Sequence, residues 1–231
     1  MSTSTVIEKA QGLGDGRWVE FPDVGWKGYS TLLRLRGRRS FPKMVYVDGT
    51  VYLMSPGYPH ERLKKRLGWI VEETAVVLRR PFIATGSTTF RRPSRKGGVE
   101  GDQSYYLANA ARILGKDRID LKMDPPPDLA IEAVDTHAAE PSIKVYRRLR
   151  VPELWICDES EMVILVLQPD GQYTPSATSL AFSSLTAAEI HDWATRPQMS
   201  SDADWLHDWR RWVRRTLRRR TRAAQGPSPG E

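Results

Sequence analysis

The chain has 231 residues, enough for one domain of ordinary size with extensions, and the composition of a soluble globular protein. Its longest apolar runs have about the length of a strand, which excludes a bilayer-spanning helix, and its N-terminus lacks the apolar core of a secretory signal. The single cysteine, Cys157, excludes an internal disulfide, so we expect a cytoplasmic protein. The formal net charge is +7, but residues 203–231 hold eight arginines and three acids, so the rest is nearly neutral.

Residues 1–40 are rich in glycine and then basic, and they show no clear hydrophobic period. We therefore predict an N-terminal arm that is only partly ordered. Residues 44–54 form two alternating runs around an Asp-Gly pair, which is typical of a β-hairpin. Apolar residues at helical spacing then predict a helix from His60 to Arg80, which Pro81 ends.

The rest of the chain alternates between strand and helix patterns. The predicted strands that follow are residues 82–92, 98–107, 128–134, 152–158 and 162–168. A helix of about ten residues between the third and fourth of these strands is a strand–helix–strand crossover, which requires some parallel pairing. The sequence thus predicts an α/β domain over residues 41–195, with a mixed sheet flanked by helices.

A basic amphipathic helix is predicted within residues 196–222, followed by a disordered tail at 223–231. Its apolar face carries three tryptophans, which could dock on the domain or on a second copy in a homodimer. Its other face carries arginines, which could bind the DNA backbone, remain solvated, or meet an anionic membrane surface. The arginines of this face are Arg214, Arg215, Arg218, Arg219 and Arg220.

Two acids lie in stretches that otherwise resemble buried strands. Asp102 is in the centre of residues 98–107, and Glu132 is deep in residues 128–134. A carboxylate inside an apolar strand costs several kcal/mol unless a positive charge compensates it. A structural ion pair with an arginine would satisfy either acid alone, whereas the two together indicate a divalent metal site. Hard oxygen ligands favour Mg²⁺ or Mn²⁺.

Other chemistries are excluded by the motifs. The four histidines are far apart in the chain and there is no CxxC motif, which argues against a Cys/His zinc site. The chain also has neither a Walker loop nor a nucleophile elbow.

Several short stretches resemble the Uma2 family, endonucleases of the PD-(D/E)XK restriction-endonuclease-like superfamily. The resemblance covers about residues 40–195, and the matching stretches are VDGTVYLMSP at 47–56 with His60, EGD at 100–102, PDLAIE at 127–132 and YRRLRVPELW at 146–155. It implies a restriction-endonuclease-like sheet and Mg²⁺-dependent hydrolysis of DNA phosphodiesters, with Asp102 and Glu132 as metal ligands.

The resemblance also implies a catalytic lysine in the helix after the second acid. The family places this lysine four or five residues before the tyrosine matched by Tyr146, where this chain has Ser142 or Pro141. Lys144 is the only lysine of that helix, and we predict that it takes the catalytic role. If Lys144 does not reach the two acids and nothing replaces it, the chain is a lapsed enzyme that binds nucleic acid or a protein partner.

Further contacts can be proposed around the two acids. His60 or Glu61, at the start of the first helix, could add a ligand or position the substrate, although a helix start without chemistry is as plausible. A basic turn could grip DNA phosphates or be only a solvated hairpin tip; its residues are Arg91, Arg92, Arg95 and Lys96. A third hypothesis is an interaction protein that assembles through its Trp/Arg helix.

Overall fold

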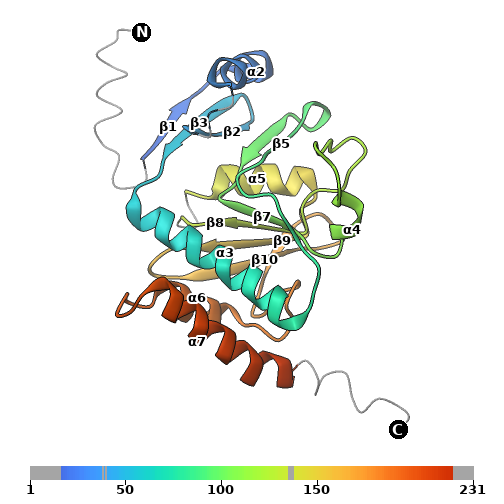
Figure 1. The fold of residues 1–231 in the computed structure, drawn as a ribbon. Helices are drawn as coiled ribbons and strands as arrows, with labels where there is room; N and C mark the ends of the chain where they lie inside the picture. The colour runs from blue at the N-terminus through green and yellow to red at the C-terminus, as the bar shows by residue number, and fades with distance from the viewer. Residues whose placement is uncertain (1–16, 38, 40, 135–137, 221–231) are drawn as a thin grey trace.

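The computed structural model describes residues 17–37, 39, 41–134 and 138–220 (Figure 1). The strands of these residues form two sheets, of five and six strands, rather than the one mixed sheet that the sequence predicted. The mixed α/β class itself is confirmed. None of the helices in the described ranges is both long and apolar enough to cross a membrane.

The first sheet, which we call sheet A, is antiparallel throughout. In spatial order it contains β1 (Arg17–Phe21), β3 (Thr50–Ser55), β2 (Lys43–Val47), β6 (Gly97–Glu100) and β5 (Thr89–Arg92). The predicted hairpin at 44–54 is therefore confirmed as β2 and β3. A short 3₁₀ turn, Pro93–Arg95, connects β5 to β6.

The N-terminal segment is more regular than predicted, because residues 17–36 form β1 and helix α2 (Gly25–Arg36). Helix α2 lies on one face of sheet A (Figure 1). On that face the Tyr29 ring stacks on Tyr46 with 5.0 Å between the ring centroids. Strand β1 pairs along its whole length with β3. This order comes from contacts with distant residues, which local periodicity does not record.

The second sheet, sheet B, is mixed. In spatial order it contains β11 (Tyr173–Ser176), β10 (Met162–Leu167), β9 (Glu153–Cys157), β8 (Leu129–Glu132), β7 (Gln103–Tyr106) and β4 (Ile83–Ala84). The pair β8–β9 is parallel and is connected by helix α5 (Glu140–Leu149), as the crossover pattern predicted. The other neighbouring pairs of sheet B are antiparallel.

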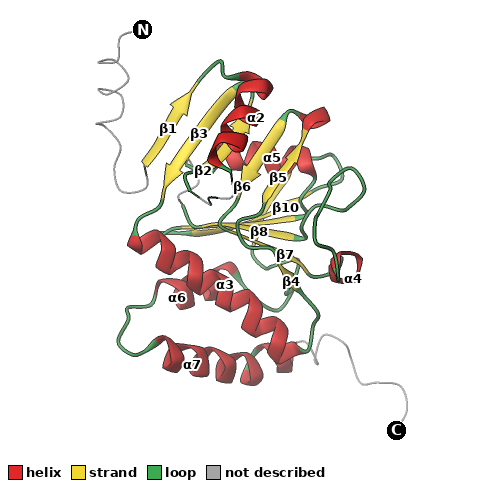
Figure 2. Ribbon diagram, turned by 45° about the horizontal axis from the view of Figure 1, so that its top comes forward, coloured by secondary structure: helices red, strands yellow, loops and turns green. Residues whose placement is uncertain are grey.

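Three helices lie together on one side of sheet B (Figure 2): α3 (Tyr58–Leu78), α6 (Ala187–Thr195) and α7 (Asp202–Arg215). The predicted helix over 60–80 is α3. A four-residue helix, α4 (Ala110–Ile113), follows β7. Helix α5 lies on the opposite side of sheet B, towards sheet A (Figure 2). One core cluster therefore joins α3, α6 and α7 to sheet B, and a second joins α5 to both sheets.

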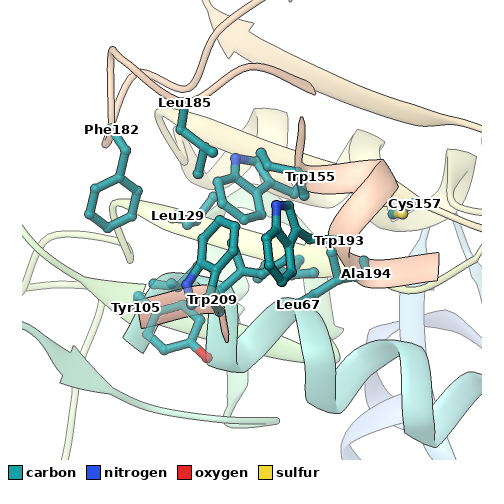
Figure 3. Packing of buried hydrophobic residues seen from close by; sticks show 14 of the residues in the cluster. Leu67, Tyr105, Leu129, Trp155, Cys157, Phe182, Leu185, Trp193, Ala194 and Trp209 are labelled. Carbon is teal, nitrogen blue, oxygen red and sulfur yellow. The ribbon is translucent and has the colours of Figure 1, made fainter. Parts of the chain in front are cut away.

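The tryptophan face of α7 is covered by its own chain. Trp209 is completely buried, and its ring lies 5.2 Å from that of Trp193 on α6 (Figure 3). Arg210 donates to Glu73 of α3, with Nη2 2.7 Å from Oε1. Of the alternatives that the sequence left open, the structure selects docking on the domain. The predicted tail at 223–231 lies outside the described residues.

The predicted strand 98–107 is divided between the two sheets. Strand β6 ends at Glu100 in sheet A, and β7 begins at Gln103 in sheet B, so Gly101 and Asp102 form the junction. The Tyr146 hydroxyl lies 2.1 Å from the place where a Cβ of residue 101 would be, which explains the glycine. The Asp102 amide donates to the Ile131 carbonyl at 3.1 Å and fixes the junction against β8.

Candidate active site

Two buried carboxylates and one ammonium group meet at the junction of the two sheets. Lys43, the first residue of β2, has its Nζ 2.5 Å from Asp102 Oδ1 and 3.8 Å from Glu132 Oε2. Asp102 is 0% exposed, Glu132 2% and Lys43 5%. Because this grouping takes one residue from sheet A, one from the junction and one from sheet B, it exists only when both sheets are packed together.

Asp102 is held from several sides. Its Oδ2 accepts hydrogen bonds from the Ala133 amide at 2.7 Å and contacts His60 Nε2 at 3.0 Å. Burial alone would oppose ionisation, but Lys43 and His60 hold the pKa of Asp102 below its usual range. Asp102 is therefore a fixed negative charge at neutral pH.

Glu132 is in a different electrostatic state. Its Oε1 accepts from the Tyr146 hydroxyl of α5 at 2.9 Å. Burial, with the nearby charge of Asp102, outweighs the attraction of Lys43 and raises the pKa of Glu132 to about 7. Burial also opposes the charge of Lys43, but Asp102 and Glu132 together raise its pKa. The site thus holds one fixed anion, one cation and one carboxyl that titrates near neutrality.

Lys144 does not reach the two acids, so the structure contradicts its predicted position. Its Nζ lies 2.7 Å from Glu140 Oε1, an i,i+4 pair on the outer face of α5, and its side chain is 44% exposed. Lys43 has the contacts that were expected of Lys144. The strand alternation of β2 carried a signal for this, because Lys43 shares a face with Val45 and Val47, which belong to the core between the sheets.

The start of α3 contributes His60 but not Glu61. His60 contacts Asp102, and its other ring nitrogen, Nδ1, is buried 3.5 Å from Glu61 Oε1 without forming a hydrogen bond among the described residues. The Glu61 side chain is 47% exposed and pairs with Lys64 at 3.2 Å. The two residues that the sequence treated alike therefore occupy different environments.

The predicted nucleic-acid contacts lie on two other surfaces. Arg91 lines a cleft of about 1030 Å³ between α2, β5 and residues 116–122. Lys96 is exposed, Arg92 is partly buried, and the side chain of Arg95 lies outside the described part of the structure. On the C-terminal helical segment, the predicted contacts Arg214, Arg215, Arg218 and Arg219 are all exposed. None of these arginines was brought to the buried acids.

The donor set fits one hard divalent cation. Two carboxylates converge on a point where a positive charge is already held, and Mg²⁺ usually takes only one or two protein carboxylates and keeps several waters. Within the described ranges, no group of three or more His, Cys, Asp and Glu side chains has the arrangement of a metal site. Any such ion would therefore be held by Asp102 and Glu132 together with water or substrate oxygens.

The protein belongs to the mixed α/β class. Its two sheets meet at a junction that carries Asp102, and α3 and α5 cover this junction. A model of the Uma2 family, described as "Putative restriction endonuclease", matches residues 29–197, and the chain belongs to the Uma2 family. This confirms the resemblance found in the sequence and makes the protein nuclease-like.

One similar solved structure is described as the crystal structure of a putative nuclease belonging to DUF820 from Anabaena variabilis ATCC 29413. It is 17% identical to this chain, with a TM-score of 0.49, and the match covers 70% of this chain and 96% of that one. No curated protein matches the chain.

Proposed function

We propose that this protein is a metal-dependent endonuclease that hydrolyses DNA phosphodiester bonds at the site formed by Asp102, Glu132 and Lys43. The observation that carries the proposal is the convergence of both carboxylates on the Lys43 ammonium group, at 2.5 and 3.8 Å. Two acids and one lysine in this arrangement provide negative charge for a cation and positive charge for a phosphate.

The described residues suit distinct tasks in such a reaction. Asp102 and Glu132 would hold Mg²⁺ or Mn²⁺, which when bound lowers the pKa of water and polarises a phosphate oxygen. Lys43 would stabilise the negative charge that develops on the phosphate, because it is a buried cation in fixed geometry. His60 and Tyr146 orient the two carboxylates through their contacts with Asp102 and Glu132.

The alternative of a lapsed enzyme depended on the absence of a lysine near the acids. Lys144 is indeed directed away, but Lys43 supplies an ammonium group within ion-pair distance of both carboxylates. The ground for that alternative is therefore weaker than the sequence suggested. We favour the active nuclease.

Nicking of supercoiled plasmid at low salt tests the proposal. We expect cleavage with Mg²⁺ or Mn²⁺ that is lost with EDTA and falls at least about a hundredfold in Glu132→Gln and in Lys43→Met, since removal of one preorganised charge costs about that much. Lys144→Gln is the matched control, because it removes one lysine charge from the same region without touching the acids.

Equal loss in the Lys144→Gln and Lys43→Met proteins would contradict the assignment of Lys43. Absence of cleavage under all conditions, with DNA still retained in a gel shift, would instead favour a domain that only binds nucleic acid. Circular dichroism of each variant shows whether the fold is retained.

A further inference from the structure

A second pocket lies beside the first turn of α3, where that helix meets the end of α6. It has a volume of about 460 Å³. Arg62 and Arg66 of α3 and Arg196, which follows α6, line it, and we call it the arginine pocket. Glu159 is the one acid among its lining residues, and Tyr58 is at its edge with 76% of its surface exposed.

Arg66 is the unusual member of this pocket because it is buried and no acid among the described residues contacts it. Only 3% of its surface is exposed. Its Nη1 donates to the main-chain carbonyls of Ala194, at 3.1 Å, and of Arg196. Its guanidinium also lies 5.8 Å from the ring centroid of Trp205, and its Nε is buried without a hydrogen-bond partner. These partners are dipoles and a ring face, so none of them carries a formal negative charge.

The electrostatic balance of the pocket is therefore positive. In the described part of the chain no carboxylate forms an ion pair with Arg62 or Arg66, whereas Arg196 pairs with Asp192. Burial and then the neighbouring charge of Arg62 lower the pKa of Arg66, which Asp202 only partly offsets. A buried charge without a counter-charge is costly. A bound anion would supply the missing charge.

The arginine pocket and the candidate active site both adjoin the first turns of α3. Tyr58, Arg62 and Arg66 are spaced four residues apart and so share one face of the helix. His60, which contacts Asp102, lies in the same first turn as Tyr58. At a rise of about 1.5 Å per residue, Arg62 and Arg66 lie about 3 and 9 Å further along the axis than His60, and they face a different side of α3 because two residues turn the helix by about 200°. The width of a helix with its side chains, about 10 Å, therefore adds to this separation. Duplex DNA carries one charge per strand for about every 3.4 Å of its axis, so this distance corresponds to a few nucleotides.

We propose that the arginine pocket binds a backbone phosphate of the nucleic-acid substrate, a few nucleotides from the bond at Asp102 and Glu132. This inference rests on the proposed function for the identity of its ligand. Arg62 contacts the phosphate from the partly exposed side and Arg66 from the buried side. The exposed Tyr58 ring stacks on a nucleotide beside that phosphate.

The first test measures DNA binding by fluorescence anisotropy, with the full chain carrying Glu132→Gln so that the probe is not cleaved. In this background, Arg62→Gln is compared with Lys65→Gln, an exposed lysine on the same helix that does not line the pocket. We expect Arg62→Gln to weaken binding about tenfold, as expected for loss of one charge-assisted contact. The slope of log K against log salt falls by about 1. Lys65→Gln leaves the affinity within about twofold. Equal effects in the two variants would overturn the proposal.

The second test uses inorganic phosphate as the probe and does not depend on nuclease function. Phosphate raises the Tm relative to chloride at equal ionic strength, because a ligand of the native state stabilises it. This shift is retained in Lys65→Gln and lost in Arg62→Gln. A shift that persists in Arg62→Gln would remove the pocket as the phosphate site. An Arg62-dependent shift without any binding of DNA would support the anion site but overturn its nucleic-acid ligand, together with the proposed function.

Discussion

Two residues, Lys43 and Ser142, explain why the positive charge of the candidate active site comes from sheet A and not from α5. Ser142 is 1% exposed, and its hydroxyl interacts with Glu132, which slightly offsets the rise in the pKa of that acid. It stands at one of the two positions, four or five residues before Tyr146, where the family resemblance places a lysine; the other is Pro141. Lys43 reaches the same two carboxylates from the other sheet. We infer that Lys43 takes over the function of a lysine that α5 does not direct towards the two acids.

Exchange of the two positions tests this inference. Lys43→Met should abolish nicking, and Ser142→Lys introduced into the same protein should restore at least about a tenth of the original rate. The reason is that Ser142 and Tyr146 share one face of α5, and Tyr146 already contacts Glu132. Initial rates of plasmid nicking measure the effect. A double variant that is folded but nicks plasmid no faster than Lys43→Met would contradict the inference.

The two acids should respond to pH in opposite ways. The pKa of Glu132 is raised from 4.5 to about 7, so its contribution to stability is present below pH 4.5 and is lost as the pH rises through 7. The free energy of unfolding of Glu132→Gln, which stays neutral, should therefore differ from that of the parent by less than about 1 kcal/mol at pH 5. At pH 8 the free energy of unfolding of Glu132→Gln should exceed that of the parent by as much as about 3 kcal/mol. Urea denaturation in EDTA at both pH values measures this difference.

Asp102 provides the comparison. Its pKa is lowered, so its contribution is present above the unfolded value of 3.8 and is lost only in acid. Asp102→Asn should consequently be less stable than the parent at both pH 5 and pH 8, by about 3 kcal/mol or more, because it leaves Lys43 buried without its main partner. If the difference in free energy of unfolding between Glu132→Gln and the parent did not change with pH, the raised pKa of Glu132 would be contradicted.

At the scale of secondary structure, the elements that local pattern determines were predictable. The hairpin of β2 and β3, helix α3 and the crossover through α5 each follow from hydrophobic periodicity and turn residues. Helix α6 begins with a capping box, in which the Thr186 hydroxyl accepts from the Glu189 amide and the Glu189 carboxylate accepts from the Thr186 amide.

The elements that depend on distant partners were not predictable. Residues 98–107 have the composition of one strand, but they divide at Gly101 and Asp102, where the Tyr146 hydroxyl leaves no room for a Cβ at residue 101. Strand β1 exists through its pairing with β3. For the site, the acids could be found because a buried carboxylate is conspicuous in an apolar strand. The alternation of β2 did carry a signal for Lys43, but the predicted hairpin began at residue 44, so this lysine fell just outside it.

At the scale of the whole molecule, the end of the described chain completes the core built by its middle. Trp205, Trp209 and Val213 of α7 lie in the cluster that α3 and α6 form over sheet B. Arg220 extends this attachment by contacting Glu189 of α6 at 2.9 Å. The opposite face of the same segment carries the exposed arginines. One helix thus combines a structural face with a candidate surface for nucleic acid, and the two can be separated by substitution.

Two variants of this segment should therefore have opposite effects. Trp209→Ala should lower the free energy of unfolding by about 3 to 5 kcal/mol, because it leaves a cavity where a fully buried indole was packed. Replacing Arg214, Arg215, Arg218 and Arg219 with glutamine should change stability by less than about 1 kcal/mol, since exposed charges contribute little. The second variant should nevertheless flatten the salt dependence of DNA binding, by up to about 0.9 for each phosphate contact that is lost. Urea denaturation and anisotropy titrations at several salt concentrations measure the two effects. An unchanged salt slope would leave α7 with only its structural role, because its arginines would then be solvated charges on the outside of a core helix.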